Sequence, residues 1–474
     1  MSKVFKIKTI DEFMSESSVP TPVEVTKPKH GRKESMCDQA WNYVQFFPQR
    51  KAIGYCCRTA PVELTDEIIL EKGNDLFFNP DHVVTRRKNM LAGIRDHQCD
   101  TCWRIENNNL ESKRTTWDMM KVLRQTYPDI PKDATLDSDL PWDTYYKAES
   151  TKIIEVILGN TCDAKCVYCS DYFSSQWAAE KRKYGEDTYL TFEADEDSVY
   201  VKSFWEWYKV AYKTAEYINF IGGEPLIIKD IFKYFDKMIE IHSADPPPPG
   251  APKKELSVVT NGNTPTELLT RFFDKAEKLS AYFNIAVMIS GEDTEDQIEY
   301  VRHGTKWSQW SENVERYMTN PTIEVRFLPA LQLLTLPTFY KYLEYISDLY
   351  IRTGVPCKLH YATVSWPNEF NLEFIPIEFV PSIDKSLAVL EDLIHLKKLN
   401  GVDAGLIIHD EHYLKSLKLV KDLAIKQNTS ITKNQEWAVK FVKFFDKLDS
   451  RRDTVWWETF PDFLPLKDLS TNAK

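Results

Sequence analysis

The chain has no hydrophobic run long enough to span a bilayer, and its polar, charged first 35 residues lack the apolar core of a signal peptide. It also lacks an excess of positive charge, since it has 60 Lys and Arg but 71 Asp and Glu, for a net charge of −11. These absences argue against a membrane partner and against a general nucleic-acid surface. We therefore expect a soluble, cytoplasmic protein.

The chain also has few cysteines, nine in 474 residues. They are arranged as a clustered triple and a CxxC, which disulfides in a reducing cytosol explain poorly and which metal or cluster ligation explains well. The length exceeds what one hydrophobic core usually fills, so we expect a main domain with one or two appended modules.

The clustered triple has the spacing CxxxCxxC and is formed by Cys162, Cys166 and Cys169, directly after the apolar run 153–158. No histidine or fourth cysteine stands close behind the loop, the next ones being His242 and Cys357. A structural zinc knuckle is the alternative interpretation, but a closed site of that kind would recruit a fourth ligand. Three thiolates on a four-iron cluster leave one iron open for a small molecule.

A second motif follows the next predicted strand and consists of Gly222, Gly223, Glu224 and Pro225. A double glycine lets the backbone approach a ligand that a side chain would block, and the carboxylate of Glu224 can bond an ammonium group. Together with CxxxCxxC, this GGEP tetrapeptide resembles the motifs of the radical S-adenosylmethionine (radical SAM) enzymes. The resemblance implies that GGEP receives the methionyl amino group of S-adenosylmethionine.

Further positions resemble cofactor-binding residues of that family. Tyr168 matches the aromatic position near adenine. Asn261 lies in a Thr-Asn-Gly sequence found near the cofactor's ribose and carboxylate, although Asn-Gly also forms plain turns. Ser290 stands where relatives carry the Asp of Ser-Ile-Asp-Gly. Arg302 would bind the cofactor carboxylate through its planar fork, or is a surface arginine.

Five cysteines lie between residues 36 and 117, and four of them would close a second metal site: Cys37, Cys56 or Cys57, Cys99 and Cys102. Adjacent side chains point in opposite directions in an extended chain, so one of the 56/57 pair is expected to ligate, and we favour Cys56. A structural zinc site is the alternative.

This segment resembles the SPASM/twitch modules that carry an auxiliary 4Fe-4S cluster in many radical SAM enzymes. The resemblance rests on the cysteines together with Phe77-Phe78-Asn79-Pro80, Arg86 and Met90-Leu91-Ala92-Gly93. Two departures are present. The module precedes the main domain, and Gln49-Arg50-Lys51 stands where relatives have a turn glycine.

Strand patterns end at residues 158, 221, 259, 289, 328 and 364, and helical patterns cover 231–241, 265–279, 307–318 and 338–352. This alternation predicts βαβ units with a parallel sheet, in which the carboxyl ends of the strands build the site. It fits the α/β fold of the radical SAM partial (β/α)6 barrel. The expected organisation is a polar tail (1–35), an iron-sulfur module (36–117), a linker (118–150), the barrel (151–368) and a helical extension (369–474).

Two local predictions complete the chain. A C-terminal helix is expected to be capped by Ser382, with an apolar face that includes Ile383 and Leu387. Cys357 lies at the start of the sixth strand, away from the chemistry, so a buried inert thiol is favoured over a hydrogen-atom donor. No catalytic side chain for the substrate step is identified.

The resemblance implies a reaction in which a reduced cluster on the CxxxCxxC loop cleaves S-adenosylmethionine to methionine and a 5′-deoxyadenosyl radical, which takes a hydrogen atom from substrate. A flavodoxin or ferredoxin would donate the electron. Peptide or protein side chains are the substrate class that SPASM/twitch relatives imply, and a sugar or nucleotide-linked small molecule is the alternative. A non-catalytic iron-sulfur or zinc scaffold is the alternative of another class.

Overall fold

The computed structural model describes residues 31–468 except 108–111, 113, 115–117, 190–194, 361, 365–366, 371 and 373. The predicted polar tail lies outside the described residues except for 31–35. The chain divides into two compact units. The first contains the described residues up to 159 with 189–222 and 237–256, and the second contains 160–188, 223–236 and the described residues from 257 onward. No helix of the described chain is both long and apolar enough to cross a membrane.

The strands of the first unit are β1 (Tyr43–Phe47), β2 (Ala52–Gly54), β3 (Val62–Glu63), β4 (Ile153–Ile157) and β5 (Tyr217–Ile221), in the order β3-β2-β1-β4-β5. β1 and β2 form an antiparallel hairpin, while β1 and β5 both run parallel to β4. The hairpin turn uses Lys51 at φ 47°, so a lysine takes the left-handed conformation that glycine adopts most readily. The cysteine-rich segment thus contributes strands beside β4.

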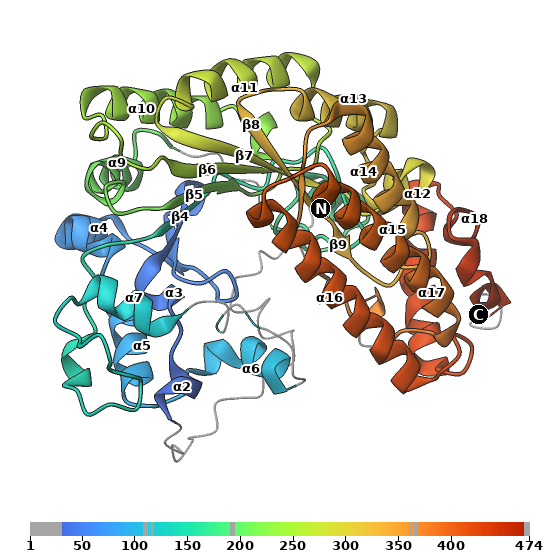
Figure 1. The fold of residues 1–474 in the computed structure, drawn as a ribbon, viewed down its shortest axis with the longest axis horizontal. Helices are drawn as coiled ribbons and strands as arrows, with labels where there is room; N and C mark the ends of the chain where they lie inside the picture. The colour runs from blue at the N-terminus through green and yellow to red at the C-terminus, as the bar shows by residue number, and fades with distance from the viewer. Residues whose placement is uncertain are drawn as a thin grey trace, which may run out of the picture. The chain divides into compact units, whose positions relative to one another are not determined.

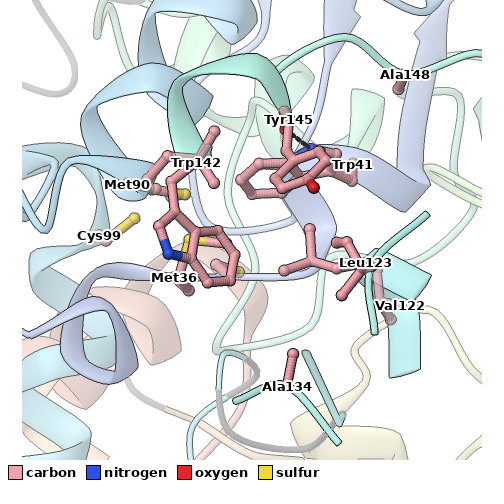
Figure 2. Packing of buried hydrophobic residues seen from close by; sticks show 14 of the residues in the cluster. Met36, Trp41, Met90, Cys99, Val122, Leu123, Ala134, Trp142, Tyr145 and Ala148 are labelled. Atoms are coloured by element: carbon pink, nitrogen blue, oxygen red, sulfur yellow. Dashed lines mark hydrogen bonds between the residues drawn. The ribbon is translucent and has the colours of Figure 1, made fainter. Parts of the chain in front are cut away.

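The helices α2 (Arg32–Ser35), α3 (Gln39–Asn42), α5 (Asp81–Leu91), α6 (Asp100–Asn107) and α7 (Met119–Thr126) surround a core of their own, while α4 (Asp66–Lys72) and α9 (Val199–Ala211) pack against each other. Trp41 lies in the middle of this core (Figure 2), where its indole nitrogen donates to the carbonyl of Tyr145 at 3.0 Å. Leu123 and Trp142 are buried in the same cluster. The segment predicted as a linker therefore packs into the cysteine-rich core, because its apolar side chains find partners there.

Most strands of the second unit continue the β/α alternation: β6 (Lys254–Thr260), β7 (Phe283–Ser290), β8 (Ile323–Leu328), β9 (Ala330–Leu331), β10 (Lys358–Leu359) and β11 (Ala362–Thr363). β8 is parallel to both β7 and β10, and β9 is parallel to β11. β6 begins in the first unit and ends in the second, whereas α10 begins in the second unit and ends in the first.

The helices that alternate with these strands are α8 (Ser175–Lys183), α10 (Ile231–Ala244), α11 (Thr266–Leu279), α12 (Glu295–Val301), α13 (Trp307–Met318) and α14 (Phe339–Thr353). The four predicted helices are confirmed as α10, α11, α13 and α14, with ends within three residues of the prediction. The α/β class with a parallel sheet, as a partial barrel requires, is confirmed as well.

The C-terminal region is helical, as predicted, and contains α15 (Val380–Leu399), α16 (Ala404–Gln427), α17 (Gln435–Arg452) and α18 (Trp456–Thr459). Helix α15 packs against both α14 and α16 (Figure 1). The predicted cap at Ser382 is wrong, because α15 begins two residues earlier with Pro381 in its first turn. Proline fits that position since its missing N–H would have no partner there. The predicted face is buried, with Ile383 at 0% and Leu387 at 8% exposure.

Candidate functional site

The CxxxCxxC loop follows the carboxyl end of β4. Cys162 and Cys166 are each 9% exposed and Cys169 is half-buried. Burial raises the pKa of both Cys162 and Cys169, and the neighbouring Cys166 thiol raises each further. The three thiols are thus neighbours, although no three Cys, His, Asp or Glu side chains of the described chain enclose a metal ion. Their number and softness fit an iron-sulfur cluster.

Backbone hydrogen bonds hold this loop from two sides. The Glu224 amide donates to the carbonyl of Thr161 at 2.8 Å. On the other side, the amide of Lys165 donates to His303 and that of Val167 donates to Val301, each at 2.8 Å. The loops after β4, β5 and α12 are therefore joined through main-chain groups, which fixes the loop's conformation independently of its side chains.

Glycines make these close approaches possible. A Cβ on Gly223 would lie 2.2 Å from the carbonyl oxygen of Thr161, and one on Gly304 would lie 2.6 Å from that of Asp163. Gly304 also has φ +110°, which side chains rarely adopt. The space at Gly223 is thus occupied by the cysteine loop itself, so this glycine is required for the packing of loop on loop.

Glu224 is completely buried and accepts three hydrogen bonds. Its carboxylate accepts from the Thr260 hydroxyl at 2.9 Å, from the Asn261 amide at 2.6 Å and from the Leu226 amide at 3.1 Å. Pro225 is buried beside it at the start of the short 3-10 helix Pro225–Ile227. The side chain of Glu224 therefore ties the GGEP loop to the end of β6.

The buried carboxyl group of Glu224 is expected to make the free energy of unfolding depend on pH. Burial, reinforced by Asp163, raises its pKa to about 8 from the usual value of 4.5. The folded state then holds a proton that the unfolded state releases between pH 4.5 and 8, so the stability contributed by this group falls across that window by about 1.4 kcal/mol per pH unit. Urea unfolding of Glu224→Gln should lack this component of the slope.

The exposed Glu240, whose carboxylate pairs with Lys237, provides the matched control. Glu240→Gln should leave the slope of the parent unchanged. Equal slopes for the parent and Glu224→Gln between pH 5.5 and 8 would contradict the raised pKa.

Asn261 also contacts the cysteine loop. Its side-chain amide donates to the Asp163 carboxylate at 2.6 Å, and the Asn263 amide donates to the other oxygen of Asp163 at 3.3 Å. Gly262 has φ +78°, and the chain bends at the Thr-Asn-Gly sequence. It is more than a plain bend, because the side chains of Asn261 and of the following Asn263 bind the loop that carries the cysteines.

Arg302 is 5% exposed, which excludes the surface alternative. Two of its nitrogens donate to one oxygen of Glu292 at 3.1 and 2.7 Å, and Tyr168 donates to the other at 2.9 Å. A third nitrogen lies 3.9 Å from the Cys166 sulfur. Burial disfavours the Arg302 charge, but Glu292, Tyr168 and Cys166 together outweigh it and raise the pKa of the guanidinium. A fixed positive charge therefore lies beside a cysteine of the loop.

The sequence did not point to Glu292. The expected carboxylate position is occupied by Ser290, which ends β7 and accepts a hydrogen bond from the Trp310 indole at 3.2 Å. The carboxylate that meets Arg302 comes two residues later, after Gly291. The acidic pair that follows Gly291 was the available signal, but only the fold shows that its first member faces inward.

The five N-terminal cysteines gather in the first unit. Cys37, Cys99 and Cys102 are buried, Cys56 is half-buried and Cys57 is exposed. Burial raises the pKa of Cys37, and Cys99 and Cys102 both add to the rise. The pKa of Cys56 is raised mainly by the Cys57 side chain, and Cys37 raises it further.

This arrangement corrects one argument from the sequence. Cys56 and Cys57 were expected to point apart because the chain was taken as extended. The chain leaves β2 at Gly54 and turns, so the two thiols are hydrogen-bonding neighbours. Cys357 lies in the second unit and is 1% exposed, and burial raises the pKa of its thiol to about 11, as expected of a buried inert thiol.

The central segment of the chain matches a known protein family. Residues 156–321 match the model of the radical SAM superfamily. No curated protein matches the chain by sequence.

Solved structures give weaker likenesses. Streptococcus suis SuiB bound to S-adenosylmethionine is 13% identical over 52% of this chain and 48% of that chain, with a TM-score of 0.31. SuiB bound to its precursor peptide SuiA is 12% identical over 66% and 62%, with a TM-score of 0.35. The methyltransferase TsrM from Kitasatospora setae, with cobalamin and a [4Fe-4S] cluster, is 12% identical over 44% and 36%, with a TM-score of 0.29. The match thus spans between about a third and two thirds of these proteins.

The segment matched by the family model contains the CxxxCxxC loop, the GGEP loop and the loops that carry Asn261, Ser290 and Arg302. Residues 156–321 of the chain therefore form a segment that matches the radical SAM superfamily.

Proposed function

We propose that the chain is a radical SAM enzyme in which Cys162, Cys166 and Cys169 hold a 4Fe-4S cluster and S-adenosylmethionine binds beside residues 222–225. When bound, these two groups supply one-electron cleavage to methionine and a 5′-deoxyadenosyl radical, which abstracts a hydrogen atom from substrate. The residues proposed to contact S-adenosylmethionine are Tyr168, Gly222, Gly223, Glu224, Pro225, Asn261, Ser290 and Arg302.

The observation that carries this proposal is the joining of the cysteine loop to its neighbours. Thr161 accepts from the GGEP loop, and Asp163 accepts from the loop after β6. Lys165 and Val167 donate to the loop that contains Arg302. A pre-formed arrangement of this kind keeps ligands and cofactor at a fixed separation, which the transfer of one electron requires.

The chain's own groups prepare this site in two ways. Burial raises the pKa of Cys166, and the buried charge of Arg302 opposes this rise and so favours the thiolate that ligates iron. Glu292 holds that charge in place and accepts from the Tyr168 hydroxyl, so the aromatic ring proposed to lie near adenine is fixed as well. Burial of the loop excludes water from a reactive radical.

We further propose that Cys37, Cys99, Cys102 and Cys56 or Cys57 hold a second metal centre in a module formed by residues 36–117. The mutual influence of these thiols supports this proposal. An auxiliary 4Fe-4S cluster is the favoured occupant, and structural zinc is the alternative because four thiolates suit both.

For the substrate we propose a peptide or protein side chain, the class implied by the resemblance to SPASM/twitch modules, with a flavodoxin or ferredoxin as electron donor in the cytoplasm. A sugar or nucleotide-linked compound is the second candidate. A peptide substrate should increase 5′-deoxyadenosine release above the substrate-free rate, and a peptide library tests this directly.

Iron and sulfide content of anaerobically reconstituted protein tests the cofactor assignment. The parent is expected to hold about eight irons and to release 5′-deoxyadenosine under dithionite, and the Cys162→Ala/Cys166→Ala/Cys169→Ala variant about four irons with no nucleoside. Cys357→Ala removes a buried thiol outside both sites and should match the parent.

Four irons in the parent and none in the triple variant would overturn the auxiliary cluster and favour zinc. A fully loaded parent that releases no nucleoside, with or without candidate substrates, would overturn the enzyme assignment and favour a scaffold.

A further inference from the structure

Strand β8 has an apolar face and a polar face. Its odd-numbered residues are buried, with 6%, 1% and 0% exposure for Ile323, Val325 and Phe327. The Phe327 ring packs edge-on against Tyr342 of α14 at 6.2 Å, so this face lies under the helix. Side chains alternate along a strand, so Glu324 and Arg326 project from the opposite face, which α14 does not cover.

Two cations share one carboxylate on that face. Glu324 accepts from Arg326 of the same strand at 2.5 Å and from Lys358 of β10 at 2.8 Å. The two cationic side chains are 9% and 14% exposed, whereas that of Glu324 is 38% exposed. The three side chains together carry a net charge of one positive unit, in a protein whose overall charge is strongly negative.

Two histidines adjoin these charges. The rings of His360, which follows β10, and His409 of α16 stack with centroids 4.7 Å apart. Among the described residues, Nε2 of His360 is buried and has no hydrogen-bond partner. Burial lowers the pKa of His360 to about 3, and His409, Arg326 and Lys358 lower it further against the effect of Glu324. The electrostatic potential around this ring is therefore positive.

Strand register relates these residues to the proposed cofactor site. Ser290 at the end of β7 pairs with Leu328 at the end of β8. Lys358 and Leu359 pair with Arg326 and Phe327, and the His360 amide donates to the Phe327 carbonyl at 2.8 Å, so His360 continues the same row. Neighbouring strands are about 4.8 Å apart, which puts the His360 backbone about 10 Å from Ser290.

We infer that Arg326, Lys358, His360 and His409, which together with Glu324 are here named the β8–β10 basic patch, bind a carboxylate or phosphate group of the substrate. This inference rests on the proposed function, because it gives the substrate an anionic group about 10 Å from the cofactor. Arg326 and Lys358 supply charge-assisted donors, and a neutral His360 supplies a further N–H in its Nε2 tautomer. In the free protein the Glu324 carboxylate pairs with both cations, so it competes with the substrate anion for them.

This competition distinguishes a binding site from a structural ion cluster. In a binding site, removing Lys358 weakens anion binding, whereas removing the charge of Glu324 strengthens it. Each change alters one charge-assisted hydrogen bond, so we expect about a tenfold effect on the half-saturating anion concentration, in opposite directions. A structural cluster predicts no saturable response to anions in any of these proteins.

The experiment follows histidine side-chain resonances of the cluster-loaded parent during titration with inorganic phosphate and, separately, with acetate. The resonances of His360 and His409 should shift and saturate, while those of the exposed His395 should not. Lys358→Gln should raise the half-saturating concentration about tenfold and Glu324→Gln should lower it about tenfold. Tighter phosphate than acetate binding would identify a phosphorylated substrate, and the reverse a carboxylate.

Lys398→Gln is the matched control, because Lys398 has the same charge but lies in an exposed pair with Glu411. It should titrate like the parent. Absence of a saturable shift with both anions, or equal titrations of Glu324→Gln and the parent, would overturn the inference. Anion binding without nucleoside release would support the anion site and overturn the proposed function. Nucleoside release without anion binding would support the proposed function and overturn the anion site.

Discussion

Gly223→Ala is expected to lower the rate of 5′-deoxyadenosine formation at least about hundredfold, because a displacement of about 1 Å at a positioned site costs that much. The added Cβ would lie 2.2 Å from the Thr161 carbonyl oxygen and 2.7 Å from the Asn160 carbonyl carbon. Both neighbours are backbone atoms, so the cysteine loop itself must move. The measurement is single-turnover nucleoside release at saturating S-adenosylmethionine.

The control is Gly31→Ala, since a Cβ on Gly31 meets nothing within 4 Å and its φ of −61° suits any residue. This variant should react at the parental rate. If Gly223→Ala also retained the parental rate, the close fit of the GGEP loop on the cysteine loop would not be needed for the reaction.

The second large effect concerns stability. Lys397 of α15 and Asp410 of α16 form an ion pair at 2.6 Å with both side chains 0% exposed. Asp410 also accepts from the Leu359 amide at 3.0 Å, which joins the helical extension to β10. Asp410→Ala leaves the lysine charge buried without its partner and is expected to reduce the free energy of unfolding by about 3–5 kcal/mol.

Chemical denaturation monitored by tryptophan fluorescence checks this prediction. Glu411→Ala breaks the exposed neighbouring pair with Lys398 and should cost less than about 1 kcal/mol. The double variant Lys397→Met/Asp410→Leu should recover most of the loss, since an apolar pair avoids burying charge. A cost for Asp410→Ala no larger than that for Glu411→Ala would show that the pair is not critical.

The elements with strong periodicity were predictable from sequence. Helix α13 has the predicted bounds of 307–318, because its apolar spacing is regular and its neighbours on both sides break the pattern. Start signals were less reliable, as α15 shows: Ser382 is a good cap by residue type, but Pro381 already occupies the first turn. Local propensity alone does not decide between two adjacent starts.

The site was predictable as a set of motifs, while its contacts were not. Spacing identified the three cysteines and the GGEP tetrapeptide. It gave no sign that Glu224 turns inward to the end of β6, or that Glu292 holds Arg302. These contacts join residues 37 and 10 positions apart, and their geometry depends on how strand ends meet in the fold.

The central claim is that the cluster on Cys162, Cys166 and Cys169 contacts S-adenosylmethionine directly. The most direct test is the electron paramagnetic resonance spectrum of dithionite-reduced Cys37→Ala/Cys56→Ala/Cys57→Ala/Cys99→Ala/Cys102→Ala protein, which keeps only this cluster, before and after addition of S-adenosylmethionine. We predict that the g values shift on addition. An unchanged spectrum from the fully loaded cluster at saturating S-adenosylmethionine would contradict the claim.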